Sequence, residues 1–225
     1  MYIYEMHQHT CEASACGRES VEAVVRSLKK QGFAGVVLTD HFYHGNSRIS
    51  RDLPWEDFVK PYVEAYEKAK AVGQELDFDV LFGLEEGVGK GKEVLLYGIT
   101  PEFVYAHPEL RNADLRLISE LVRAEGGVVV QAHPFRAREY IIDPLEELPA
   151  ELLDGVETYN VHNSPEENAM ACAFAVKHSL LPTAGSDSHD SGEGARMGIA
   201  CENRIPDEKA LAQILKSGAY TLYLP

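Results

Sequence analysis

The chain has 225 residues, of which 45% are hydrophobic and 25% charged, a composition that is typical of a globular protein and excludes disordered and fibrous classes. Its 36 acidic and 21 basic residues leave a net charge of −15 at pH 7 with nine neutral histidines, which argues against binding of long nucleic acids. Chains of this length often fold as one unit, and we expect a single domain over residues 1–225.

Export and membrane signals are not evident in the sequence. No segment approaches the roughly 20 apolar residues that span a bilayer. The start, MYIYEMHQHT, lacks the basic and apolar segments of a signal peptide. The cysteines, at positions 11, 16, 172 and 201, form no Cys-x-x-Cys pair, which is consistent with reduced thiols. We therefore expect a cytoplasmic protein with no membrane partner.

Short apolar segments alternate with segments of helical periodicity along the chain. In chain order, strands are predicted at residues 2–6, 35–38, 78–84, 94–99, 128–131, 155–159 and 181–184, with a further one around Ile199. Helices are predicted at residues 20–30, 55–72, 113–124, 165–178 and 206–215, and glycines such as Gly32, Gly73, Gly126 and Gly218 are read as stop signals. This alternation favours parallel strands with crossover helices, and seven or eight strands favour a closed or nearly closed barrel.

Several histidines stand at the ends of predicted strands. His7 and His9 end the first strand, where alternation places them on one face with Ile3 and Glu5. The opposite face, with residues such as Tyr4, is expected to pack under helices. Two imidazoles at positions i and i+2 can converge on one metal ion, although a His-x-His pair alone is weak support for a metal site.

The same pattern recurs at other predicted strands. His41, His133, and the pair Asp187 and His189 follow apolar segments, and Glu85 ends another strand. In a parallel barrel these strand ends share one face, where active sites are built from residues of several strands. Imidazole and carboxylate ligands suit Zn, Mn or Fe, and a shared carboxylate can bridge two ions. Such ions would make the local field positive and permit an anionic substrate.

Six motifs in order resemble the PHP family, the polymerase and histidinol phosphatase domains that are metal-dependent phosphoesterases. They are His7-Gln8-His9-Thr10, Thr39-Asp40-His41, Gly83-Leu84-Glu85, Ala132-His133-Pro134, Gly155-Val156-Glu157-Thr158-Tyr159-Asn160 and Gly185-Ser186-Asp187-Ser188-His189. The resemblance spans residues 7–189 and implies an α/β fold, a distorted TIM-like (β/α)7 barrel with two or three divalent ions at the C-terminal ends of the strands.

The resemblance also implies a ligand set. His7, His9, Glu85 and Asp187 would hold one ion, Glu85 and His133 a second, and His41 and His189 a third. Two positions depart from the family pattern. Cys16, with Glu12 as a fallback, stands where the third ion often has a His or Asp, and a thiolate would favour Zn or Fe over Mn. Leu95 stands where the second ion often has a His; His107 is an alternative, although an exposed loop position is the more common reading.

Other polar residues are candidates for contacts with a substrate or with the ligands. Arg136 and Arg196 could clamp a phosphate, and His44 lies in a polar loop after His41. Glu157 and Asn160 are expected to orient ligand imidazoles. Strand alternation lets only one of the neighbours Glu85 and Glu86 face the site, and the motif favours Glu85. The segment Gly87-Val88-Gly89-Lys90-Gly91-Lys92 lacks the spacing of a phosphate loop and is read as a turn between strands.

The predicted function is hydrolysis of a small phosphorylated metabolite, a phosphomonoester, by a metal-bound hydroxide. Arg136 would neutralise developing charge, and Asp187 or His189 would protonate the leaving oxygen. Two alternatives stay open. An amidohydrolase-like enzyme also begins with His-x-His, and a PHP module can bind metal without catalysis.

Overall fold

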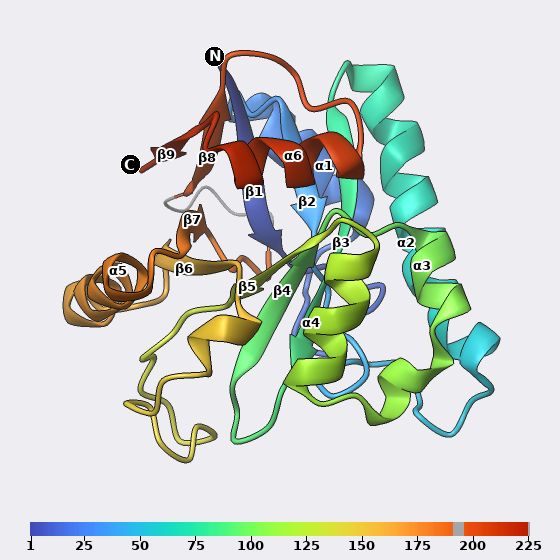
Figure 1. The fold of residues 1–225 in the computed structure, drawn as a ribbon. Helices are drawn as coiled ribbons and strands as arrows, with labels where there is room; N and C mark the ends of the chain where they lie inside the picture. Colours follow the sequence, from blue (N-terminus) through green and yellow to red (C-terminus); the bar gives the residue numbers. More distant parts are fainter. Residues whose placement is uncertain (191–195, 225) are drawn as a thin grey trace.

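The computed structural model describes residues 1–190 and 196–224, and its strands form one nine-stranded sheet (Figure 1). The order is β7-β6-β5-β4-β3-β2-β1-β8-β9, so the first seven strands follow one another in chain order. The strands are β1 (Tyr2–Gln8), β2 (Gly35–Leu38), β3 (Asp79–Gly87), β4 (Glu93–Tyr97), β5 (Val128–Gln131), β6 (Gly155–Asn160), β7 (Leu181–Gly185), β8 (Gly198–Cys201) and β9 (Thr221–Tyr223). The helices are α1 (Val21–Lys30), α2 (Trp55–Leu76), α3 (Pro101–Ala106), α4 (Leu115–Ala124), α5 (Pro165–His178) and α6 (Glu208–Ser217), with short 3₁₀ helices η1 (Pro108–Asn112) and η2 (Ala150–Leu152).

The sheet curls until the segment after β7 meets the end of β1. Gln8 and Ser188 form a parallel bridge, and the His9 backbone N–H donates to the Ser188 carbonyl at 2.9 Å. These contacts between the two ends of the sheet nearly close the barrel. β8 pairs with the start of β1 and with β9, which adds an antiparallel ribbon at this edge. The predicted α/β barrel with its strand ends gathered on one face is confirmed.

β4 departs from strict strand–helix alternation because it runs antiparallel to both β3 and β5. Residues 88–92 form the turn between β3 and β4, where the Val88 N–H donates to the Lys92 carbonyl at 2.8 Å. The prediction of a turn here, and not a phosphate loop, is confirmed. As a result, the first residue of β4, Glu93, lies at the same barrel edge as the last residues of its neighbours.

The five predicted helices begin and end near the predicted positions, apart from the end of α2, and α3 is a further helix that the sequence analysis did not predict. The Ser20 side chain caps α1, and Ser164 forms a capping box with Glu167 at the start of α5. α2 continues through Gly73, which was read as a stop, and ends at Leu76. A Cβ at Gly73 would lie 2.5 Å from the Phe78 carbonyl oxygen, so this glycine permits close packing of the chain that leaves the helix.

His7 and His9 converge as predicted, but the other predicted face of β1 does not lie outside the barrel, because the strand carries a β-bulge between Glu5 and Gln8. Tyr4 and Met6 join Val37 and similar residues in an apolar cluster that fills the barrel below the site. The bulge inserts a residue that shifts the alternation, which brings His7 to the ligand cluster above them. α6 covers the opposite end of the barrel, where Leu211 belongs to the same cluster (Figure 1).

Outside the barrel, a second apolar cluster packs the remaining helices on the sheet, with Phe58 and Val122 among its fully buried side chains. This two-layer arrangement fixes the strand ends, because each strand is held between the inner cluster and a helix. Over the described residues, each helix is too short or too polar to cross a bilayer.

Candidate metal centre

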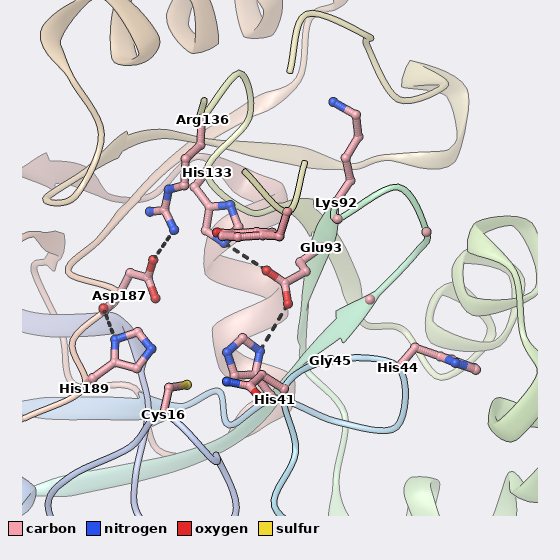
Figure 2. Close-up of a pocket in the computed structure, with 15 residues that line it drawn as sticks. Cys16, His41, His44, Gly45, Lys92, Glu93, His133, Arg136, Asp187 and His189 are labelled. Atoms are coloured by element: carbon pink, nitrogen blue, oxygen red, sulfur yellow. Dashed lines mark hydrogen bonds and ion pairs between the residues drawn. The ribbon is translucent and has the colours of Figure 1, made fainter. Parts of the chain in front are cut away.

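A cavity of about 580 Å³ opens over the C-terminal ends of the parallel strands and the beginning of β4 (Figure 2). Its lining combines imidazoles, carboxylates, one thiol and a glycine-rich rim: Cys16, His41, His44, Gly45, Asn46, Gly87, Gly89, Gly91, Lys92, Glu93, His133, Arg136, Tyr140, Asp187 and His189. Most of the ligands that the sequence predicts line this cavity or lie directly beneath it.

The first donor group lies deepest and contains the four predicted ligands of one ion. His7 Nε2 lies 3.3 Å from Glu85 Oε1 and 3.5 Å from Asp187 Oδ1. His9 Nε2 lies 3.3 Å from Glu85 Oε2 and 3.1 Å from Asp187 Oδ1. Ligand atoms bound at the usual Zn distances lie about 2.8–3.6 Å from one another, so these spacings suit one ion.

The second donor group surrounds the other side of Glu85. His133 Nε2 lies 2.9 Å from Glu85 Oε1, as the prediction of a shared carboxylate requires. Leu95, the position from which a family-type His would reach this group, is fully buried in the apolar cluster below and supplies no donor. Glu93 is the residue that sequence reasoning missed, because its carboxylate lies 3.4 Å from His133 Nε2 and 3.2 Å from His41 Nδ1.

A third donor group is built from imidazoles, and the Cys16 thiol lines the cavity with two of them. Donor atoms of His9, His41 and His189 lie within 4.8 Å of one another. The Cys16 thiol hydrogen-bonds to His189 and His41, and although burial acts to raise its pKa, these two side chains lower the pKa of Cys16 to about 6. The structure therefore brings Cys16 to the predicted place, whereas Glu12 accepts hydrogen bonds from the backbone N–H of Val21.

Glu157 holds two of the ligand residues in position. Its Oε1 lies 3.0 Å from His7 Nδ1, and its Oε2 accepts hydrogen bonds from the His133 backbone N–H at 2.8 Å and from Asn160 Nδ2 at 2.9 Å. Because a carboxylate only accepts, the proton of His7 lies on Nδ1 and Nε2 is free to bind an ion. Gly185 lies against this pair, where a Cβ would meet Glu157 Oε1 and His7 Cβ at 2.5 Å.

Ser14 and Asp40 do the same for His9. The Ser14 hydroxyl donates to Asp40 Oδ1 at 2.6 Å, so its oxygen accepts from His9 Nδ1 at 3.1 Å and from the His41 backbone N–H at 3.0 Å. Asp40 also accepts from the backbone and hydroxyl of Thr10, each at 2.6 Å. The Thr-Asp-His motif thus supplies both a ligand, His41, and the carboxylate that orients another ligand.

Arg136 lies within the site and contacts three side chains of the protein. Its Nη1 lies 2.7 Å from Asp187 Oδ2, its Nη2 donates to Asn160 Oδ1 at 2.7 Å, and its Nε donates to Asn163 Oδ1 at 2.9 Å. The guanidinium lines the cavity beside Asp187 (Figure 2) and connects this ligand to Asn160 and, through it, to Glu157.

The other predicted residues lie at different distances from the centre. His44 lines the outer cavity and points away from the donor groups (Figure 2). Arg196 is not among the lining residues; it is buried, and its Nη1 donates to Gln8 Oε1 at 3.1 Å. The structure thus argues against its predicted substrate contact. His107 ends α3 and pairs with Glu109 at 2.8 Å, which confirms the loop reading.

Glu85 and Glu86 divide their roles as predicted from strand alternation. Glu85 faces the donor groups, and Glu86 accepts hydrogen bonds from the backbone N–H groups of Tyr43, His44 and Gly87. Burial raises the pKa of Glu86 to about 8. For Glu85, burial acts in the same direction, but His41 and then His7 hold its pKa well below the usual value. The inward carboxylate is therefore ionised, as a metal ligand must be.

The donor atoms face one another in a way that suits metal ions. His7 Nε2 and His9 Nε2 lie 3.1 Å apart, although the acceptor beside each Nδ1 assigns the lone pair to Nε2. His41 Nδ1 and Glu85 Oε2 lie 2.8 Å apart but are misaligned, and among the described residues neither buried atom has a hydrogen-bond partner. Nitrogen and oxygen donors that face one another at these distances are placed to share a cation, so the residues fit bound metal.

Comparisons with known proteins give a family match over part of the chain and several structures of similar fold. A family model described as PHP-associated matches residues 165–220, from the start of α5 to the residue before β9. A search of curated proteins finds no significant match.

Solved structures share the fold at low sequence identity. A two-domain protein from Bacteroides vulgatus that contains a predicted PHP-like metal-dependent phosphoesterase has a TM-score of 0.70 at 12% identity. The match covers 99% of this chain and 64% of the Bacteroides chain. A candidate metal-dependent phosphoesterase from Bifidobacterium adolescentis has a TM-score of 0.57 at 19% identity, and the match covers 94% of this chain and 95% of the Bifidobacterium chain. An amidohydrolase from Chromobacterium violaceum, solved with sulfate and no metal, has a TM-score of 0.60 at 16% identity, with 84% and 88% coverage.

Proposed function

We propose that this chain, which its motifs, its barrel fold and the PHP-associated match assign to the PHP family, is a metal-dependent phosphoesterase for small phosphomonoesters. The observation that carries the proposal is the cluster of ionised carboxylates and imidazoles on the floor of one cavity. Their ligand atoms are spaced as the ligand atoms of a metal ion are. Two or three divalent ions, of Zn, Mn or Fe, are the cofactors that such a donor set would hold.

The residues divide into those that hold ions and those that hold the ligands. His7, His9, Glu85 and Asp187 would bind the first ion, His133 the second beside Glu85, and His41, His189 and Cys16 the third. When bound, the ions would supply an activated hydroxide and neutralise the phosphoryl oxygens. Glu157 and Ser14 keep the imidazoles in the tautomer that binds metal.

Arg136 and His189 are the side chains best placed to assist the reaction. Asp187 uses Oδ1 toward His9 and Oδ2 toward Arg136, so a proton on it would disturb both contacts. His189 Nδ1 donates to the Asp187 carbonyl at 2.9 Å, which leaves Nε2 for Cys16 and the cavity. His189 then either holds the third ion or protonates the leaving oxygen, and Arg136 offers its remaining N–H groups to the phosphate.

The substrate is inferred from the size and charge of the cavity. A volume of about 580 Å³ suits a metabolite and not a polymer. The bound ions reverse the field of a chain with net charge −15 only locally, so a small anion can enter while extended nucleic acid is repelled. Lys92, His44 and Tyr140 line the outer part of the cavity and would contact the remainder of the substrate.

The experiment is elemental analysis of the purified protein followed by a phosphatase screen over a metabolite library. We expect at least two transition-metal ions per chain and release of phosphate from small phosphomonoesters after reconstitution with Mn, Zn or Fe. Absence of bound metal together with absence of phosphatase activity after reconstitution would refute the proposal.

An amidohydrolase reaction is the second candidate, and the likeness to the Chromobacterium violaceum amidohydrolase fold favours it. In this chain the shared ligand is Glu85, and the lysine of the cavity lining, Lys92, points away from the donor groups (Figure 2). A panel of amides and lactones therefore accompanies the phosphate esters. If the amides or lactones are hydrolysed faster than the phosphate esters, the protein is an amidohydrolase-like enzyme and not a phosphoesterase.

A non-catalytic metal-binding module is the third candidate. The double variant His7→Ala, Asp187→Ala removes two ligands that meet at 3.5 Å. If the wild type binds metal that this variant loses, and the wild type hydrolyses none of the substrates, the chain is a metal-binding module without catalysis. Unchanged melting and activity in the variant would instead indicate a scaffold that does not depend on metal. Loss of bound metal together with activity supports the phosphoesterase.

A further inference from the structure

Glu93 occupies a position from which sequence reasoning expected no ligand. We propose that Glu93 binds the second ion together with Glu85 and His133, and that it makes this site richer in oxygen donors than a family-type His at the same place would. The inference rests on the metal centre of the proposed function and extends it to a ligand specific to this chain and to the metal that the site prefers.

The direction of β4 brings Glu93 to the centre. Because β4 is antiparallel to β3, its first residue pairs with Gly87, the last residue of β3, and its third residue, Leu95, pairs with Glu85. Glu93 and Leu95 share one face of the strand, two residues apart. Leu95 lies lower in the barrel, in the apolar cluster, while Glu93 reaches the cavity with a side chain that is 14% exposed.

Glu93 and Glu85 both lie between the imidazoles of His41 and His133, and donor atoms of His41, Glu85 and Glu93 lie within 4.8 Å of one another. Glu93 Oε1 lies 3.2 Å from His41 Nδ1, and Glu93 Oε2 lies 3.4 Å from His133 Nε2 (Figure 2). Glu85 Oε2 lies 2.8 Å from His41 Nδ1, and Glu85 Oε1 lies 2.9 Å from His133 Nε2. Each of the four pairwise spacings falls in the range of about 2.8–3.6 Å expected for two ligand atoms that share an ion.

The surroundings of Glu93 differ from those of a structural carboxylate. Glu86, two positions from the same turn, accepts three backbone N–H groups and so serves the loop after His41. Within the described residues, the polar contacts of the Glu93 carboxylate are the two imidazoles and nothing else. A carboxylate aimed only at imidazoles, one of which has a buried unsatisfied nitrogen, is placed for a shared cation.

The donor chemistry then differs across the centre. Glu85, Glu93 and His133 offer oxygen and imidazole donors, which suit Mn²⁺ or Fe²⁺. On the other side, Cys16 lies with His41 and His189 and offers sulfur, which suits Zn²⁺. Replacing Glu93 with the imidazole of the family pattern is therefore expected to move the second site toward Zn²⁺.

The test compares the metal-stripped wild type with Glu93→Gln, Glu93→His and the control Glu146→Gln. Glu146 is a neighbouring carboxylate that pairs with Lys90 at 2.6 Å and belongs to no donor group. Each protein is titrated with Mn²⁺ and followed by electron paramagnetic resonance, and bound metal is counted by elemental analysis after desalting. Circular dichroism of the stripped proteins checks that each variant is folded.

We expect Glu93→Gln to lose one equivalent of Mn²⁺ or to bind it about ten-fold or more weakly, while Glu146→Gln behaves as the wild type. Glu93→His should regain the equivalent with Zn²⁺ preferred over Mn²⁺ relative to the wild type. Equal Mn²⁺ number and affinity in Glu93→Gln and the wild type would overturn the inference and leave the metalloenzyme proposal standing.

Two further outcomes separate this inference from the proposed function. A wild type that binds no metal after reconstitution overturns both. If Glu93→Gln loses one ion but the wild type hydrolyses no phosphoester, the ligand role is supported and only the proposed substrate class is refuted.

Discussion

Replacing Glu157 with Gln tests whether the metal centre depends on the residues behind it. The side chain is 1% exposed and serves three donors, at His7 Nδ1, the His133 backbone N–H and Asn160 Nδ2. Gln keeps the volume but turns one oxygen into an NH₂ group, so either His7 or the pair of donors at Oε2 faces a donor instead of an acceptor. His7 then loses the partner that holds its proton on Nδ1.

The expected loss is worked from these contacts. Removing the partner of a metal-bound imidazole typically weakens metal binding about 10- to 100-fold, which corresponds to about 1.4–2.7 kcal/mol at 25 °C. The donor left facing an NH₂ group adds a cost of about 1–3 kcal/mol to the folded state, with or without metal. Glu157→Gln should therefore melt at a lower temperature and also gain less stability from metal than the wild type does.

The assay is a competition titration of stripped protein against a chelating indicator, paired with melting curves recorded with and without metal. Thr158→Val is the matched control, because the Thr158 hydroxyl donates to the Thr183 carbonyl at 3.0 Å and contacts no ligand. It should lower stability and leave metal affinity unchanged. An unchanged metal affinity in Glu157→Gln would refute the reasoning that Glu157 sets the tautomer of His7.

Two further substitutions separate metal binding from folding. Cys16→Ser should abolish the sulfur-to-metal charge-transfer absorption of the Co²⁺-substituted protein, because the thiol lies with His189 in the third donor group; persistence of the band would show that this sulfur is not a ligand. Glu208→Leu should lower the free energy of unfolding in urea by about 1–3 kcal/mol, because one buried carboxylate oxygen, Oε1, accepts from both the Phe82 N–H and the Tyr66 hydroxyl at 2.9 Å and leucine offers neither donor an acceptor. Its metal content should equal that of the wild type, and a reduced content would contradict the separation of this contact from the site.

The predicted ligands that the structure brings to the cavity share one local property. His41, His133 and Asp187 each stand shortly after an apolar strand, so the end of a hydrophobic segment marks their position along the chain. In parallel strands this local position also fixes the place in space, because all C-terminal ends meet at one face. Glu157 was accessible in the same way, as part of a motif on a strand that pairs in parallel with β5 and β7.

The features that the sequence did not reveal depend on pairing between distant segments. Leu95 and Glu93 lie on the same strand, and which of them reaches the cavity is decided by the antiparallel pairing of β4 with β3 and β5. Apolar periodicity is the same in both directions along a strand, so it carries no information about this choice. Arg196 likewise looked available to a substrate, but the packed structure places its Nη1 on Gln8.

The amino-acid sequence by itself determined the alternation of strands and helices that favours a barrel and the types of donor at the strand ends, because these follow from local periodicity and from motifs read along the chain. Only the tertiary structure decided which donors meet. The bulge between Glu5 and Gln8 shifts the alternation of β1, and the reversal of β4 brings Glu93 opposite His133. Both features arise from the register between strands, which is fixed when the barrel closes around its core.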